Sequence, residues 1–375
     1  MPQHLQGHRK GIQPVSLPSL EGYAPEVLAV PVQLVQQCIV VFGLLQQRYL
    51  LDRVQTEAGE PPAPSEISAQ EPAAAPGADK DLQRDAFRGA LGSMAGAPQI
   101  QAYGFMLIHC LQKSQESQVL DRAKQEMEKY EADAELLPLI EDGYFQLGSL
   151  GGGNHFIELQ ENQDGYLCIM IHSGSRHLGK SVCDYFHKKA NELNRRWYSE
   201  VKEEYRLAFL PVQTEEGQQY IRWMNLPMDY AFENRERMLE KTCRIVKELI
   251  GKHAGLTVEF GEEINCHHNY AALENHYRAN VWVHRKGATR VREGEMAVIP
   301  GAMGSYSYVV EGKGNPETFC SSSHGAGRNY SRSGAMKEFS IEKVMVDLKE
   351  RGVVLGKRKK NDVAEECRFA YKDID

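Results

Sequence analysis

The chain has 375 residues, of which 42% are hydrophobic, and a formal net charge of −7. This length and apolar content suffice for one large or two ordinary folded domains. The negative charge excludes a protein that coats nucleic acid non-specifically, because phosphate binding needs positive potential, but it allows a local basic groove. The eight cysteines form no CxxC pair, the most apolar early run (residues 38–45) is too short to span a bilayer, and no signal-peptide pattern is present. We therefore predict a cytoplasmic protein with reduced thiols and no membrane contact.

The first part of the chain gives few structural signals. Residues 1–55 carry no definite assignment. Residues 56–80 are rich in Pro, Ala and Glu and have few large apolar side chains, which predicts a disordered linker. Within residues 81–142 we expect helical structure, because Leu120, Met127 and their neighbours recur at helical spacing over 112–137. Pro138 is expected to close that helix.

From residue 143 onward, strand-like runs alternate with glycine-bearing turns. The stretches "YFQLGSLGGGNHFIELQ" and "YLCIMIHSGSRHLG" both place a histidine beside a strand and a small-residue turn. Residues 180–208 and 228–252 are predicted helices, and short strands follow them. The pattern predicts an α+β domain over residues 143–375.

Four histidines stand among small or amide residues. They are His155, His172, His268 and His324. Neutral imidazole is a ligand for Mn, Fe, Zn or Cu, and small neighbours let a substrate approach closely. A single histidine after a strand is more often a hydrogen-bonded structural residue. Four in the same context favour a shared functional site.

Two further patterns have both a functional and a structural interpretation. The glycine runs at 151–153 and 325–327 and the loop "PGAMGSYS" at 300–307 are either ordinary turns or backbone nests that hold phosphate. No P-loop and no strand-GxGxxG-helix unit accompanies them. The segment "HRKGATRVR" contains Arg285, Lys286 and Arg290, which form either a solvated face or a phosphate-binding strip.

Taken in order, these motifs resemble the RtcB family of RNA ligases, also called tRNA-splicing ligases. The stretches that carry the resemblance are "LGSLGGGNHFIEL", "IHSGSRHLGK", "HHNYA", "VHRKGATR", "AVIPGAMGSYSYVVEGKGNPETFCSSSHGAGRNYSR" and "AYKDID". The resemblance implies an RtcB-like fold, with mixed sheets around a central nucleotide and metal cleft.

The resemblance also implies an activity. Family members use GTP and two Mn²⁺ ions to join RNA ends that carry a 3'-phosphate or 2',3'-cyclic phosphate to 5'-hydroxyl ends. A histidine becomes linked to GMP, which then activates the RNA 3'-phosphate. By motif match His324 is this nucleophile, and an archease-like protein is an implied activator.

The remaining roles carry over by position. The implied metal ligands are His155, His172 and His268. The implied nucleotide contacts are Asn154, His155, Glu158, His268, Asn269, Pro300, Gly301, Ala302, Met303, Ser307, His324, Gly325, Ala326, Gly327 and Tyr371. The candidate contacts to RNA phosphate are Arg285, Lys286 and Arg290.

The sequence departs from the family pattern in three places. No aspartate is followed three positions later by cysteine, although the family takes metal ligands from such a motif, so one or both metals are expected to be lost. Ala302 replaces a serine, and the family's terminal lysine lies beyond "YKDID". We expect a family member with an altered N-terminus and a clipped C-terminus. The alternatives are a catalytically inactive paralogue that binds RNA ends or a partner through residues 285–292, and a histidine-rich metallohydrolase.

Overall fold

The computed structural model of the chain describes residues 29–31, 39–46, 116–163, 166–205, 207–255, 257–356 and 363–374. The predicted linker at 56–80 lies outside these residues, as do most of the segments at 1–55 and 81–142. In the described part no helix is long and apolar enough to cross a bilayer.

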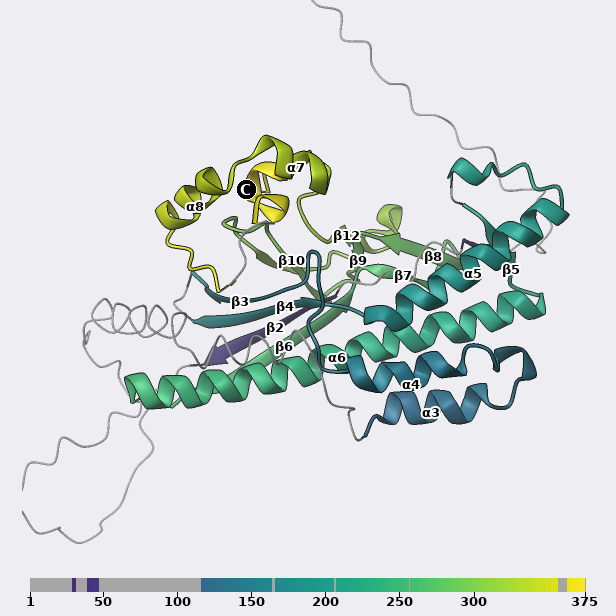
Figure 1. Cartoon of the computed structure of the whole chain (residues 1–375), viewed down its shortest axis with the longest axis horizontal. Helices are drawn as coiled ribbons and strands as arrows, with labels where there is room; N and C mark the ends of the chain where they lie inside the picture. Colours follow the sequence, from purple (N-terminus) through teal and green to yellow (C-terminus); the bar gives the residue numbers. More distant parts are fainter. Residues whose placement is uncertain are drawn as a thin grey trace, which may run out of the picture.

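A four-stranded sheet lies at the centre of the molecule (Figure 1). Its strand order is β3 (Phe156–Glu161), β4 (Leu167–Ser173), β2 (Ile39–Gln46) and β6 (Glu259–His267). Every residue of β4 is buried, as its continuous apolar sequence indicates. The long helix α6 (Glu215–Ala254) covers one face of this sheet. The core between them consists mainly of Leu167, Ile169, Ile171, Met238, Leu239, Val246, Leu249 and Ile250.

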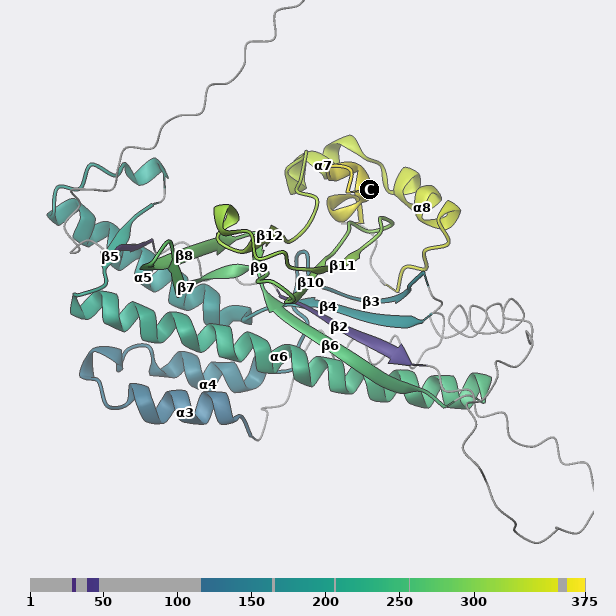
Figure 2. The same ribbon diagram turned by 180° about the vertical axis from the view of Figure 1, so that it is seen from behind.

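Three more helices pack around the first half of α6 (Figures 1 and 2). They are α3 (Gln118–Met127), α4 (Leu137–Gln146) and α5 (Arg176–Arg196). The 3-10 helix η1 (Glu131–Asp133) connects α3 to α4. The largest fully buried side chains of this second core are Trp223, Tyr220, Tyr230 and Phe186.

The other strands form two-stranded pairs. These are β1 (Ala29–Pro31) with β5 (Phe209–Pro211), β7 (Asn269–His276) with β8 (Ala279–Lys286), β9 (Ala288–Arg290) with β12 (Ser321–Ser323), and β10 (Met296–Ile299) with β11 (Tyr308–Glu311). Short 3-10 helices lie at η2 (Glu203–Tyr205) and η3 (Pro316–Thr318). The C-terminal part contains α7 (Arg332–Glu338), α8 (Ile341–Glu350), η4 (Val363–Glu366) and η5 (Arg368–Ala370), which share a small apolar core.

The α+β class is confirmed, but the expectation of mixed sheets is wrong for the described residues. β4 and β6 run in the same direction, yet β2 lies between them and runs opposite to both. Each hydrogen-bonded strand pair that the structure describes is therefore antiparallel.

The helix boundaries also differ from the prediction. The helix expected over 112–137 is shorter, because α3 ends at Met127. Pro138 is the second residue of α4 rather than the end of α3, since the first helical turn needs no N–H from proline. The helix expected over 228–252 begins at Glu215 and includes Pro227. The helix expected over 180–208 ends at Arg196, where Tyr198 turns the backbone into the left-handed region.

Candidate functional site

The four singled-out histidines lie next to one another. His172 is the last residue but one of β4, His268 follows β6 directly, and His324 follows β12 directly. The ring centroids are 6.0 Å apart for His155 and His172, 5.3 Å for His172 and His268, and 4.2 Å for His268 and His324. The last two rings are stacked, with 20° between their planes. The structure thus places in one cluster four residues that span 170 positions of sequence.

The central sheet explains why the first three meet. Val40 of β2 pairs with His172, and its neighbour Ile39 pairs with His267. Because β2 aligns the ends of β4 and β6, His172 and His268 emerge at the same edge of the sheet. His155 precedes β3, whose first residue Phe156 also pairs with His172.

Burial keeps these imidazoles neutral. His172 and His268 are 4% and 2% exposed, and burial lowers the pKa of each well below its ordinary value. Burial, with Arg176 nearby, lowers the pKa of His155 to about 4. The pKa of His324 is lowered by burial as well. All four rings therefore present a nitrogen lone pair at neutral pH.

Two or three of these histidines have a ring nitrogen suited to binding a transition metal. His172 Nε2 is buried and has no hydrogen-bond partner among the described residues. His155 Nδ1 donates to the Leu150 carbonyl oxygen at 2.8 Å, so its lone pair is on Nε2. However, no three His, Cys, Asp or Glu side chains in the described ranges form a complete metal-binding group. The histidines therefore fit as some of the ligands of a metal ion, and other groups must supply the rest.

His324 is positioned by the turn between β8 and β9. Gly287 in this turn has φ +66°, and a Cβ on it would lie 3.0 Å from His324 Cε1 and 3.1 Å from Nδ1. The Gly287 N–H donates to Asn269 Oδ1 at 2.8 Å, and the Ala288 N–H donates to the His268 carbonyl at 3.2 Å. His268 and Asn269 thereby fix the turn that supports the ring of His324.

Several residues assigned to the nucleotide also meet in space. Gln160 Nε2 donates to Glu158 Oε2 at 2.8 Å and to Ser307 Oγ at 3.2 Å, and Ser307 Oγ accepts from the Gly301 N–H at 3.0 Å. A Cβ on Gly301 would lie 2.0 Å from the Tyr306 carbonyl oxygen, so the loop requires glycine there. Burial raises the pKa of Glu158. Gln160 was missed from the sequence, although it lies two residues after Glu158 and hence on the same face of β3.

The glycine run at 325–327 adjoins the same loop and the C-terminal segment. A Cβ on Gly325 would lie 3.4 Å from the Pro300 carbonyl oxygen. The Gly327 carbonyl accepts from the Lys372 N–H at 2.9 Å. The Tyr371 hydroxyl bonds Glu366 and accepts from Arg328 Nη1 at 2.8 Å.

The remaining nucleotide candidates lie close by. Ala302 and Met303 continue the loop after Gly301, and the Ala302 carbonyl accepts from the Ser305 N–H at 2.8 Å. Met303 packs against the C-terminal core. Asn154 precedes His155, and Ala326 lies between the two glycines.

The predicted basic strip does not form one surface. Arg285 is 2% exposed, and its guanidinium forms a two-pronged ion pair with Glu274, at 2.5 Å from Oε1 and 3.0 Å from Oε2. Arg285 is therefore unavailable to an RNA phosphate, because its donors are used inside the protein. Arg290 pairs with Glu295 at 2.7 Å, and Lys286 is exposed.

Arg176 was not singled out from the sequence but lies at the cluster. Its φ of +57° is unusual for a residue other than glycine. Its Nε donates to Ser149 Oγ at 3.1 Å, and its Nη1 lies 1.7 Å from where a Cβ on Gly151 would be. The sequence feature that could have identified Arg176 is its position as the single cation in the small-residue turn "SGSRHLG".

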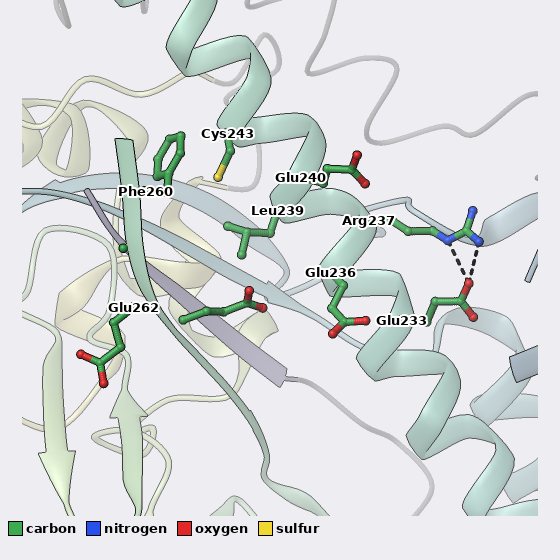
Figure 3. A pocket seen from close by; sticks show the side chains of 10 residues that line it. Glu233, Glu236, Arg237, Leu239, Glu240, Cys243, Phe260 and Glu262 are labelled. Carbon is green, nitrogen blue, oxygen red and sulfur yellow. Dashed lines mark hydrogen bonds and ion pairs between the residues drawn. The ribbon is translucent and has the colours of Figure 1, made fainter. Parts of the chain in front are cut away.

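A separate cavity of about 480 Å³ lies between α6 and β6 (Figure 3). Five glutamates line it, namely Glu233, Glu236, Glu240, Glu262 and Glu263, while Arg237 is paired with Glu233. Burial and then the charge of Glu263 raise the pKa of Glu236. An acidic lining repels phosphate, so this cavity does not suit a nucleotide.

The cluster combines neutral imidazoles, which are suited to binding a transition metal, with glycine-rich loops, whose backbone N–H groups are suited to binding an anion. The comparison with family models identifies the particular family: the model described as tRNA-splicing ligase RtcB matches residues 73–375. The chain belongs to the RtcB family.

Curated relatives agree with this assignment. "RNA-splicing ligase RtcB" of Escherichia coli (strain K12) is 38% identical over 235 residues, covering 62% of this chain and 56% of the relative. The protein of that name from Mycobacterium tuberculosis is 34% identical over 269 residues, with 63% and 60% covered. "tRNA-splicing ligase RtcB" of Thermococcus kodakarensis is 35% identical over 282 residues, with 66% and 58% covered. The matched region spans little more than half the length of these relatives.

Proposed function

We propose that this chain is a GTP-dependent RNA ligase that joins a 3'-phosphate or 2',3'-cyclic phosphate end to a 5'-hydroxyl end. The observation that carries the proposal is the stacking of His324 on His268 at 4.2 Å, at the edge of the histidine cluster and beside the loops at 300–307 and 325–327. The names of the relatives, RNA-splicing or tRNA-splicing ligases, support the same activity.

His324 is the proposed nucleophile because it is neutral and held in place. Gly287 lies beside the Cε1 and Nδ1 edge of the ring, so we assign the attack on phosphate to Nε2. In the proposed first step the Nε2 lone pair forms a bond to the α-phosphorus of GTP, and pyrophosphate leaves with the electrons of the broken P–O bond. The RNA 3'-phosphate then takes the GMP from His324. Attack by the 5'-hydroxyl joins the strands and releases GMP; a cyclic phosphate is first opened by water.

Other residues of this chain bind and orient the nucleotide. Ser307, Gln160 and the Gly301 N–H form a polar row along the loop after β10, and Glu158 lies at its end. The backbone around Gly325, Ala326 and Gly327 has no bulky side chain, which leaves room for phosphate oxygens beside His324. Asn269 holds the turn at Gly287, against which the ring of His324 lies.

His172 and His268, with His155, are the residues that would hold Mn²⁺. When bound there, the ion supplies neutralising charge for phosphate oxygens. His172 Nε2 supports this role because a buried imidazole nitrogen with no hydrogen-bond partner among the described residues is costly unless something binds it.

The test is incubation with α-labelled GTP and Mn²⁺, followed by denaturing electrophoresis. We expect a covalent adduct that is labile in acid and stable in base, and that is lost in His324→Ala. The matched control is His177→Ala, because the His177 side chain is exposed and its ring contacts Ser181 one turn along α5, while the backbone N–H that donates to Gln146 Oε1 is kept in the variant. An absence of label on folded wild-type protein would contradict the proposal.

The second candidate, an inactive paralogue that binds RNA through residues 285–292, has less support. Its central cation, Arg285, is buried and paired with Glu274. An archease-like activator and a cytoplasmic location remain predictions from the sequence.

A further inference from the structure

Several exposed aromatic side chains lie just after the C-terminal end of α5. We call residues 197–205 the aromatic turn; it projects from the molecule at the end of α5 remote from the central sheet (Figure 1). Trp197 is 42% exposed, Tyr198 92% and Tyr205 58%. Monomeric proteins rarely gather large apolar side chains on one exposed patch without a binding role.

Tyr198 is also placed where tyrosine is unfavourable for the backbone. Its φ is +52°, in the left-handed region directly after the helix, and the Ser199 N–H donates to the Asn194 carbonyl at 2.9 Å. Glycine is the common residue at this position of a helix end. A tyrosine here has a strained backbone and an almost fully exposed ring, so folding stability does not account for it. Such an outlier points to a function for the side chain.

The helix that leads to this turn is basic. α5 has six Lys or Arg and two Asp or Glu, in a chain with a net charge of −7. Lys188, Arg195 and Arg196 are exposed near its C-terminal end. The turn itself carries Glu200, Glu203 and Glu204, of which Glu204 pairs with Lys202 at 3.9 Å, so the positive charge lies on α5 and not on the turn.

α5 connects the aromatic turn to the histidine cluster. It begins after Ser175, three residues beyond His172, and its 21 residues extend about 31 Å at 1.5 Å per residue. A mononucleotide is too short for this distance, whereas an RNA strand is not.

We propose that α5 and the aromatic turn bind the single-stranded part of the RNA substrate, outside the reacting end. This rests on the proposed RNA ligase function. Bases stack on Tyr198 and Trp197, and the phosphates lie against Lys188 and Arg196. Stacking accepts every base, so the site is tolerant of sequence. The contact adds affinity for long strands and none for short ones.

The test measures binding of 3'-phosphorylated RNA of two lengths, a trinucleotide and a strand of about 12 nucleotides, within the roughly 4–16 nucleotides that such surfaces cover. For Tyr198→Gly we expect affinity for the long strand to fall about fivefold or more, with affinity for the trinucleotide unchanged. Tyr198→Phe should bind like wild type. Tyr198→Gly should be at least as resistant to unfolding as wild type, since glycine suits the left-handed backbone.

The matched control is Tyr277→Gly, because Tyr277 is 66% exposed with φ +51° in the turn between β7 and β8, and its hydroxyl donates to the Pro316 carbonyl at 2.8 Å, a contact that gives this tyrosine a structural role. It should leave RNA affinity unchanged. Long-strand binding by Tyr198→Gly equal to wild type would overturn the proposal and leave the turn as a protein-docking surface. Labelling of His324 by GTP needs no RNA, so its failure would count against the ligase function and not against RNA binding at α5.

Discussion

Gly287→Ala tests the placement of His324 directly. The new Cβ would lie 3.0 Å from Cε1 and 3.1 Å from Nδ1 of the ring, so the ring must shift by a few tenths of an ångström. The left-handed backbone at φ +66° adds roughly 1–2 kcal/mol of destabilisation for alanine. Since a misplacement of about 1 Å can lower a rate roughly 100-fold, we expect the rate of His324 labelling by GTP to fall about tenfold.

Gly352→Ala is the matched control for this experiment. Gly352 follows α8 with φ +69°, and nothing lies within 4 Å of where its Cβ would be. It should lose the same stability in urea denaturation and keep the wild-type labelling rate. Equal labelling rates for the two variants would refute the inference that Gly287 positions the nucleophile.

Two further predictions concern buried charge. Glu274→Gln leaves the Arg285 guanidinium buried without its anion, so the free energy of unfolding should fall by about 3–5 kcal/mol. Adding Arg285→Met should recover most of this loss. If urea denaturation shows a loss for Glu274→Gln no larger than that of a surface substitution, the buried ion pair is contradicted. In metal-free protein, the pKa of about 4 for His155 lies below the ordinary 6.5, so the folded state binds fewer protons than the unfolded one between these values. The contribution of His155 to the free energy of unfolding is therefore fully present above pH 6.5, and the free energy of unfolding should fall by about 3 kcal/mol as the pH drops to 4. The fall should be smaller in His155→Gln. Identical pH profiles for the two proteins in chemical denaturation would count against a buried neutral His155.

Local sequence was sufficient for the chemistry of individual residues. Small neighbours around His155, His172, His268 and His324 marked them as one set, and the structure brings them together. Continuous apolar sequence predicted the buried strand β4. These inferences succeeded because side-chain size and periodicity depend on nearby residues alone.

Helix limits could not be predicted in the same way. Pro138 is equally compatible with the end of one helix and the first turn of the next, and only the packing of α4 against α3 and α6 selects the second. Pro227 lies within α6 because contacts along the whole helix outweigh one lost hydrogen bond.

The sequence by itself determined the family, the α+β class and the identity of the clustered histidines. Only the tertiary structure decided which charges are available: Arg285 and Lys286 are adjacent in sequence, yet the pleat of β8 turns one into the protein against Glu274 and the other to solvent. The same holds for the order of strands, since β2 comes to lie between β4 and β6 through pairings distant in sequence. When the partner of a buried residue or strand lies more than ten residues away in the chain, the neighbouring sequence does not reveal it. Hydrogen bonding across the sheet determines which residues become partners.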